Sequence, residues 1–206
     1  MERFTGFIAG LGTAAGRRVV VGHWTASPLG PFTDVMTEDA DGVRTLLAPT
    51  EAVAGYVSRT YLFDDVVVAP LAARLHRPPG DDALELQVRG GPLDLRAVLG
   101  MTTLLGRALE RIPPPLAIHP AWLTAVSRLA GVLVPGVATA GSAGGGRREY
   151  YGVRSIRPIA RATTRWDGHD LGPLAPVDPP VRFGFSSVPR RPQAVAVTTT
   201  ILPPRH

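Results

Sequence analysis

The chain has 206 residues, of which 45% are hydrophobic, so it is long enough to bury a sizeable core. Its formal net charge is +5, and it contains no cysteine, which excludes disulfides and thiolate catalysis. It also contains no lysine, so every Lys+Arg position is an arginine; a lysine Schiff base, a lysine general base and a Walker-type phosphate loop are therefore excluded.

The same composition bears on location and partners. The absence of cysteine fits a reducing compartment, and the N-terminal residues lack the apolar run of a secretory signal, so we expect a cytoplasmic protein. No stretch reaches about 18 consecutive apolar residues, which predicts no membrane span. The arginines are spread along the chain and form no basic cluster, which argues against nucleic acid as a partner.

The first part of the chain predicts short strands separated by turns, as expected with 23 glycines and 21 prolines. Strands are predicted over residues 17–24, 32–38 and 43–47, the last two joined by a turn at Asp41-Gly42. Thr50 is a good N-cap for a short helix over residues 51–58.

Two further strands are predicted before the middle of the chain. Residues 64–69 contain the run Val66 to Val68, which is typical of a buried strand. Residues 83–89 alternate, with Leu84, Leu86 and Val88 on one face, and this pattern predicts a half-buried strand.

A helical period is predicted to follow. Asp94 is a candidate N-cap, and a second helix is predicted from Pro120 to Leu133, so residues 91–135 are expected to form an inserted αα-hairpin. Packing on a sheet is the expected role of this hairpin, and a membrane-surface role is the alternative. The apolar face of the first helix comprises Leu95, Val98, Leu99, Thr102, Leu105 and Leu109.

Strands return in the last third, over residues 149–154, 158–165 and 194–202, with a turn at Asp167-Gly168. The order of features in this part repeats that of the first part: a glycine loop, two arginines, a strand, an Asp-Gly turn and an Ala-Pro pair. We therefore predict two related β-rich halves, 7–90 and 136–202, within a single domain of residues 1–206. The alternative is that turn-rich proteins reuse these short patterns independently.

The predicted fold class is α+β and β-rich, an antiparallel barrel or a two-sheet sandwich with the helical hairpin inserted. A sheet of many alternating strands tends to close or fold over, since open edges promote association. Small barrels commonly enclose a ligand cavity, so we expect one here.

The richest candidate stretch runs from Gly141 to Pro176. Strand alternation places Glu149 and Tyr151 on one face, where they would form a catalytic carboxyl and a ligand-binding hydroxyl in a cavity. The alternative is an outward glutamate paired with an arginine. The preceding glycine loop, residues 141–148, could bind a phosphate or simply connect strands.

Histidines supply the other catalytic candidates. His169 lies beside Asp170 after the Asp-Gly turn, where an aspartate could orient it, although such a turn usually faces solvent. His23 and Asp34 would meet if their strands pair, as a base and its orienting group. No metal site is predicted, because the five histidines show no ligand spacing. The remaining ligand-binding candidates are Trp24, Trp166 and Arg182.

These observations predict a β-barrel-like protein that binds a small, largely apolar ligand, with no cofactor, and that uses metal-free acid/base chemistry if it is an enzyme. The alternative is a non-catalytic structural or interaction module that uses the hairpin of residues 95–133 as its partner surface. A homo-oligomer is compatible with either interpretation.

Overall fold

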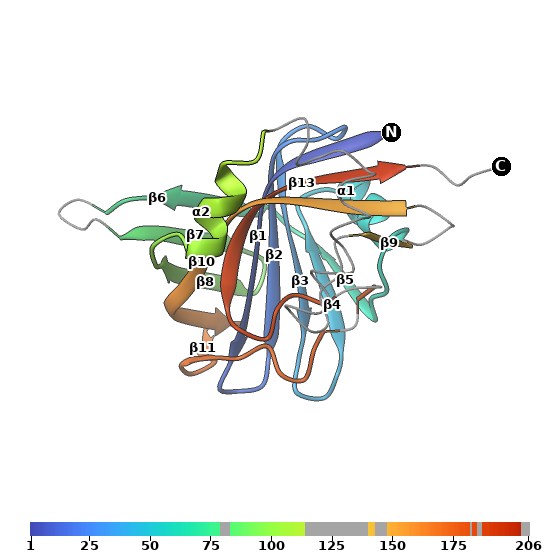
Figure 1. Cartoon of the computed structure of the whole chain (residues 1–206). Helices are drawn as coiled ribbons and strands as arrows, with labels where there is room; N and C mark the ends of the chain where they lie inside the picture. Colours follow the sequence, from blue (N-terminus) through green and yellow to red (C-terminus); the bar gives the residue numbers. More distant parts are fainter. Residues whose placement is uncertain (79–82, 114–139, 143–147, 182, 185–186, 203–206) are drawn as a thin grey trace.

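We analysed a computed structural model of the chain, which describes residues 1–78, 83–113, 140–142, 148–181, 183–184 and 187–202. The fold is β-rich and consists of one strongly curled sheet that forms a half-barrel (Figure 1). Ten strands follow one another through the sheet in the order β5-β4-β3-β2-β1-β13-β10-β8-β7-β6. These ten are β1 (Glu2–Thr13), β2 (Arg18–Ala26), β3 (Phe32–Glu38), β4 (Arg44–Ala48), β5 (Asp65–Val68), β6 (Ala72–His76), β7 (Leu84–Gly90), β8 (Leu93–Leu99), β10 (Arg148–Trp166) and β13 (Gln193–Leu202).

Three short strands lie beside this path. β9 (Ala140–Ser142) and β11 (His169–Asp170) pair with β10, and β12 (Leu174–Ala175) pairs with β1. Among the described strands all the pairs are antiparallel except β4 with β5, which are parallel and are connected through helix α1 (Glu51–Ser58). The predicted β-rich fold is confirmed at this level. The sheet curls into a half-barrel and includes one parallel pair. The more detailed prediction, an antiparallel barrel or a two-sheet sandwich, is therefore not confirmed.

Several elements occur where local signals predicted them. β3 and α1 have the predicted bounds, and the Thr50 hydroxyl accepts a hydrogen bond from the Val53 amide at 3.3 Å, as an N-cap does. Asp167 and Gly168 both have positive φ and form the turn between β10 and β11. The two strands predicted at residues 149–154 and 158–165 are one strand, β10, with a register shift between Val153 and Ser155.

The prediction of a helix from Asp94 is wrong. Residues 93–99 form β8, because Leu93, Leu95, Ala97 and Leu99 alternate and are buried against the rest of the core. A tight turn leads into this strand, since Gly90 pairs with Leu93 and only two residues connect them. A shorter helix, α2 (Leu104–Glu110), follows with Thr103 as its N-cap, and the second predicted helix lies outside the described residues.

Two of the ten strands on the main path were not predicted, and neither were the short strands β9, β11 and β12; one predicted strand was assigned the wrong environment. β1 and β6 were not predicted, although β1 lies at the centre of the sheet. Val66 and Val68 of β5 are 47% and 39% exposed, because β5 is an edge strand and not a buried one. Neither helix in the described part of the chain is long and apolar enough to cross a membrane.

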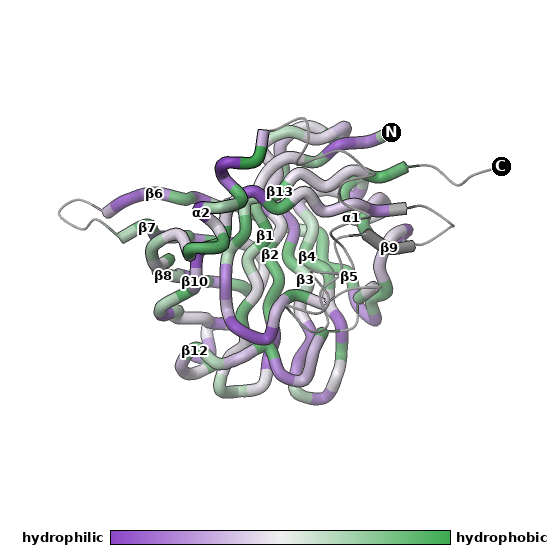
Figure 2. Tube along the Cα trace, viewed as in Figure 1, coloured by the Kyte–Doolittle hydropathy of each residue, from purple (hydrophilic) through white to green (hydrophobic). Residues whose placement is uncertain are grey.

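The sheet separates two apolar regions. On one face, β1–β4 pack against β7 and β8 through a core that includes Leu11, Val21, Leu47, Leu86 and Leu95. On the opposite face, a second region forms below α1 and the segment that follows β12. Figure 2 shows the apolar residues concentrated along β1–β4 in the middle of the molecule. The candidate site lies on this second face.

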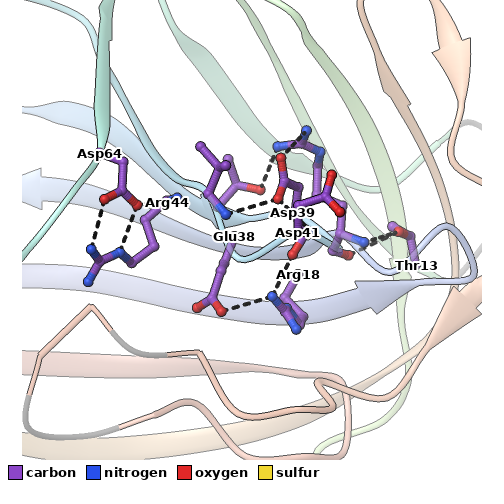
Figure 3. A network of polar contacts seen from close by, with 10 residues as sticks. Thr13, Arg18, Glu38, Asp39, Asp41, Arg44 and Asp64 are labelled. Carbon is purple, nitrogen blue, oxygen red and sulfur yellow. Dashed lines mark hydrogen bonds and ion pairs between the residues drawn. The ribbon is translucent and has the colours of Figure 1, made fainter.

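A polar network joins the ends of β2, β3 and β4 (Figure 3). The Arg18 guanidinium, which is buried, donates to Glu38 at 2.9 Å and to the Asp39 carbonyl at 2.6 Å. Arg44 donates to both carboxylate oxygens of Asp64 at 2.9 Å, a bidentate pair that lowers the pKa of Asp64 to about 2. These contacts hold the strand ends together away from the candidate site.

Candidate functional site

A cavity of about 160 Å³ lies between the sheet and its cover. Alternate residues of β1, β2, β3, β10 and β13 line the sheet side, because successive side chains of a strand point to opposite faces. The cover consists of α1, the residues just after it, and residues 181, 183 and 187–189. Most of the lining is apolar, as is typical of sites for small organic ligands.

Aromatic rings make up much of one side of the cavity. The Phe4 ring meets Trp24 and Phe32 edge to face, with centroid distances of 5.7 and 6.3 Å, and lies 5.4 Å from the Tyr56 ring. Edge-to-face contacts of this kind hold rings in defined orientations. The aromatic residues that line the cavity are Phe4, Trp24, Phe32, Tyr56, Tyr61, Tyr151 and Phe183.

Asp34 places a carboxyl group within this apolar lining. The residue is 4% exposed, and the Trp24 indole N–H donates to its Oδ1 at 2.9 Å. Burial raises the pKa of Asp34 to about 7, because desolvation disfavours the charged form more than the indole hydrogen bond favours it. Near neutral pH this group can therefore accept or give a proton.

A second polar group lies on β10. Glu149 is 1% exposed and accepts hydrogen bonds from the hydroxyls of Tyr61 at 3.1 Å and Tyr151 at 2.9 Å, and the two hydroxyls lie 2.9 Å apart. Desolvation by burial, followed by the charge of Glu149, raises the pKa of Tyr151 well above its usual value. For Tyr61, burial again acts first, and the neighbouring Tyr151 and Glu149 add to it. Both phenols therefore stay protonated as donors at neutral pH.

Thr199 adds a hydroxyl to the same wall. It lies on β13 between Phe4 and Tyr151, its register partners on the two neighbouring strands. The residue is 4% exposed and lines the cavity, yet among the described residues its Oγ1 has no hydrogen-bond partner. A buried hydroxyl without a partner is costly, so this atom is a natural contact for a polar group of a ligand.

The structure therefore brings four of the predicted site residues to one cavity. Glu149 and Tyr151 share a face of β10, as the alternation predicted, and bond to each other. Trp24 and Asp34 line the same space from β2 and β3. The roles of these residues in binding or catalysis stay predictions.

His23 and Asp34 do not form the expected pair. Their strands are neighbours, but His23 pairs with Thr33 and Asp34 with Gly22, so the two side chains lie on opposite faces of the sheet. The His23 Nδ1 lies 2.8 Å from the Thr33 hydroxyl, and its ring lies 5.0 Å from that of Phe7. Burial lowers the pKa of His23. This histidine therefore has no access to the cavity.

His169 and Trp166 also lie away from the cavity, at the β10–β11 turn. His169 is exposed, and the Asp170 carboxylate accepts from the Gly172 amide, which is turn chemistry. The Arg17 guanidinium lies 4.0 Å from the centre of the Trp166 ring, a cation–π contact. Arg182 and the centre of the glycine loop, residues 143–147, lie outside the described residues.

Sequence reasoning missed Tyr61 and Thr199. Tyr61 follows α1 and reaches Glu149 across the cavity, a contact between residues far apart in the chain. No local pattern signals such a contact. Thr199 could have been found from alternation, because it shares its face of β13 with Val197 and Ile201, which also line the cavity.

The arrangement can bind a small molecule and exchange protons with it. The apolar walls provide burial, Asp34 provides a proton donor or acceptor near neutral pH, and the phenols and Glu149 provide hydroxyl and carboxyl oxygens. Within the part of the chain that the structure describes, no three histidine, aspartate or glutamate side chains converge as ligands of a metal ion. No protein-family model, no curated protein and no solved structure matches this chain.

Proposed function

We propose that the protein binds a small, largely apolar molecule in the cavity beneath α1. The observation that carries the proposal is a cavity with apolar and aromatic walls into which two buried carboxyl groups, Asp34 and Glu149, are built. Burying a carboxyl in an apolar wall reduces folding stability unless it is compensated. Buried carboxyl groups that line a cavity despite this loss of stability are typical of binding and catalytic sites.

The size of the cavity limits the ligand. A volume of about 160 Å³ suits a molecule on the scale of benzene or a short branched chain rather than a nucleotide. The few polar groups at the wall would orient the ligand, while the apolar surface supplies most of the binding free energy.

Acid/base catalysis is the enzymatic form of this proposal. Asp34 would transfer a proton at the bound molecule, and the O–H of Tyr61 or Tyr151 would turn from Glu149 to donate a hydrogen bond to an oxygen atom that gains charge. Cytoplasmic location, the two related halves and homo-oligomer formation stay predictions of the sequence.

The experiment that tests binding is native mass spectrometry of freshly purified protein, with gentle activation to release bound molecules. A matched pair of variants identifies the site. Val153→Phe adds a ring to the cavity wall, and Val66→Phe adds the same ring to the exposed edge strand β5. We expect a co-purifying small molecule in the wild type and in Val66→Phe, and its loss in Val153→Phe.

If no molecule co-purifies, the same three proteins are titrated with small aromatic and branched aliphatic compounds, with tryptophan fluorescence as the readout. Binding that Val153→Phe blocks and Val66→Phe leaves intact supports the proposal. Binding unaffected by Val153→Phe, or no binding at all, contradicts it.

One observation favours the alternative of an interaction module. Met101, just before α2, and Leu104 and Leu105, at its start, are 88%, 78% and 50% exposed. Exposed apolar side chains that lie close together are typical of contact surfaces. Under this alternative, replacing Met101 and Leu104 by serine would abolish self-association or partner binding measured by light scattering, and would leave the cavity unchanged.

A further inference from the structure

We propose that the ligand of this cavity is a small organic cation, a substituted ammonium group carrying apolar substituents. This inference rests on the proposed function and specifies the chemical class that the site would select. It follows from three features of the cavity: its rings, its charges and an unpartnered hydroxyl.

The rings provide the first argument. Trp24, Tyr61 and Phe183 line the cavity together with four other aromatic residues. The face of an aromatic ring carries partial negative charge and attracts ammonium groups, with tryptophan the strongest of the three types. Methyl or alkyl groups on the nitrogen spread its charge and suit apolar walls, so several rings around one small cavity favour a substituted ammonium group over a bare inorganic cation.

The distribution of charge provides the second argument. The chain has a net charge of +5, yet among the described residues that line the cavity no arginine or histidine is found. The ionisable carboxyl groups there are Asp34 and Glu149, both buried. Glu149 accepts from two phenols, while Asp34 accepts from the indole N–H of Trp24 and its own backbone amide and, within the described residues, from no other side chain. An anionic ligand would be repelled here, and a cation would favour the ionised form of Asp34.

The third argument is Thr199. Its buried Oγ1 has no hydrogen-bond partner in the part of the chain that the structure describes, and Thr199 is the register partner of Tyr151 on the neighbouring strand. A protonated amine has N–H groups that this oxygen can accept, and a hydroxylated ammonium compound has an O–H that it can bond. The rings, the carboxyl and the hydroxyl are thus complementary to one molecule with a cationic centre and apolar substituents.

The test compares probes that differ only in charge. One pair is choline and its neutral carbon isostere, in which a tert-butyl group replaces the trimethylammonium group. The other pair is protonated benzylamine and benzyl alcohol. Dissociation constants are measured by calorimetry at about pH 8, above the pKa of about 7 of Asp34. We expect the charged member of at least one pair to bind at least tenfold more tightly than its neutral partner.

Variants assign that preference to the cavity wall. Asp34→Asn keeps the shape and the oxygen that accepts from Trp24 but removes the charge, and it should reduce the preference to less than threefold. Asp41→Asn, on the exposed β3–β4 turn, is the matched control and should keep it. Thr199→Val provides a second test that removes no charge, and it should weaken benzylamine more than benzyl alcohol. Circular dichroism confirms that each variant is folded.

The outcomes separate this inference from the proposed function. Equal or tighter binding of the neutral members would overturn the inference and leave a neutral-ligand cavity standing. A preference for the charged probes that survives Asp34→Asn would also overturn it, because groups other than Asp34 would then distinguish charged from neutral probes. Failure of every probe, together with no apolar binding that Val153→Phe blocks, would overturn both.

Discussion

The indole N–H of Trp24 donates to the Asp34 carboxylate at 2.9 Å, across the β2–β3 pair. The two residues are not direct register partners, since Asp34 pairs with Gly22 and Trp24 with Phe32. The diagonal contact is open because Gly22 has no side chain: a Cβ there would lie 2.6 Å from Asp34 Oδ1 and 2.9 Å from Trp24 Nε1. The absence of a side chain at Gly22 therefore leaves room for the Trp24 indole to reach the buried Asp34 carboxyl.

Asp34→Asn is expected to raise stability above neutral pH. The pKa of Asp34 is about 7 in the folded protein and 3.8 as its ordinary value, so the folded state binds the proton more tightly. The stabilisation from this group is present below about pH 4 and is lost as the pH rises towards and through 7. At about 1.4 kcal/mol per pKa unit, the variant should gain a few kcal/mol relative to the wild type at pH 8.

Urea unfolding of both proteins from pH 4 to 8 measures this difference. Asp41→Asn, at an exposed position, is the control and should show no comparable gain. A difference between Asp34→Asn and the wild type that does not grow with pH would contradict the assignment.

Gly22→Ala should break the contact between Trp24 and Asp34. The added Cβ overlaps both side chains, so one of them must move, with an expected loss of about 1–3 kcal/mol. The indole N–H resonance of Trp24, assigned by its loss in Trp24→Phe, should shift in the NMR spectrum. Gly55→Ala, within α1, is the contrasting control. A Cβ at Gly55 would meet only the Arg59 guanidinium, at 3.6 Å, which is an ordinary contact distance. Gly55→Ala should stabilise by about 0.5–1 kcal/mol.

Arg18→Met should be strongly destabilising. It removes the guanidinium that bonds Glu38 at 2.9 Å, where the side chains are only 4% and 9% exposed. Removing one partner of a buried pair costs about 3–5 kcal/mol, because the other charge stays buried. Arg89→Met, in a pair with 63% and 48% exposed side chains, should cost about 1 kcal/mol or less. Similar midpoints for the two variants in urea would show that the Arg18 pair is not a buried one in solution.

Tyr61 and Tyr151 should resist deprotonation in the native protein. Burial raises both pKa values well above 10, so their stabilising effect holds below pH 10 and is lost as the pH rises further. In a titration followed by phenolate absorbance, Tyr61→Phe and Tyr151→Phe should each remove signal from the high-pH step. Loss of signal near pH 10 instead would mean that the hydroxyl is in contact with water.

The elements predicted well from the sequence are those with a local signal. β3 lies before an Asp-Gly turn, and α1 begins at Thr50, whose cap is visible in the sequence. β8 was mistaken for a helix because Leu95, Val98 and Leu99 also fit a helical period; pairing with β7 and β10 decides between the two. β1 was missed because its glycines weaken the strand pattern. At Gly6 and Gly12 a Cβ would lie about 2 Å from a backbone oxygen of a neighbouring segment.

The candidate site was predictable to the same extent. Alternation alone places Glu149 with Tyr151, and neighbouring strands bring Asp34 near Trp24. The faces of β2 and β3 could not be assigned from the sequence, so His23 was grouped with Asp34 although it points into the other core. The role of Tyr61 could not be predicted from the sequence, because its contact with Glu149 exists only in the complete tertiary fold.

The position of β13 has a consequence for how the protein is made. This strand lies between β1 and β10, and Glu2 is paired with Ile201, so the centre of the sheet joins residues from the two ends of the described chain. Pairings of such large sequence separation form slowly, because a long loop must close before they contribute stability. Until β13 forms, the strands that precede it in the chain therefore leave a gap in the cavity wall between β1 and β10. On the ribosome, no ligand can bind until residue 201 has emerged and β13 has been inserted between its two neighbours.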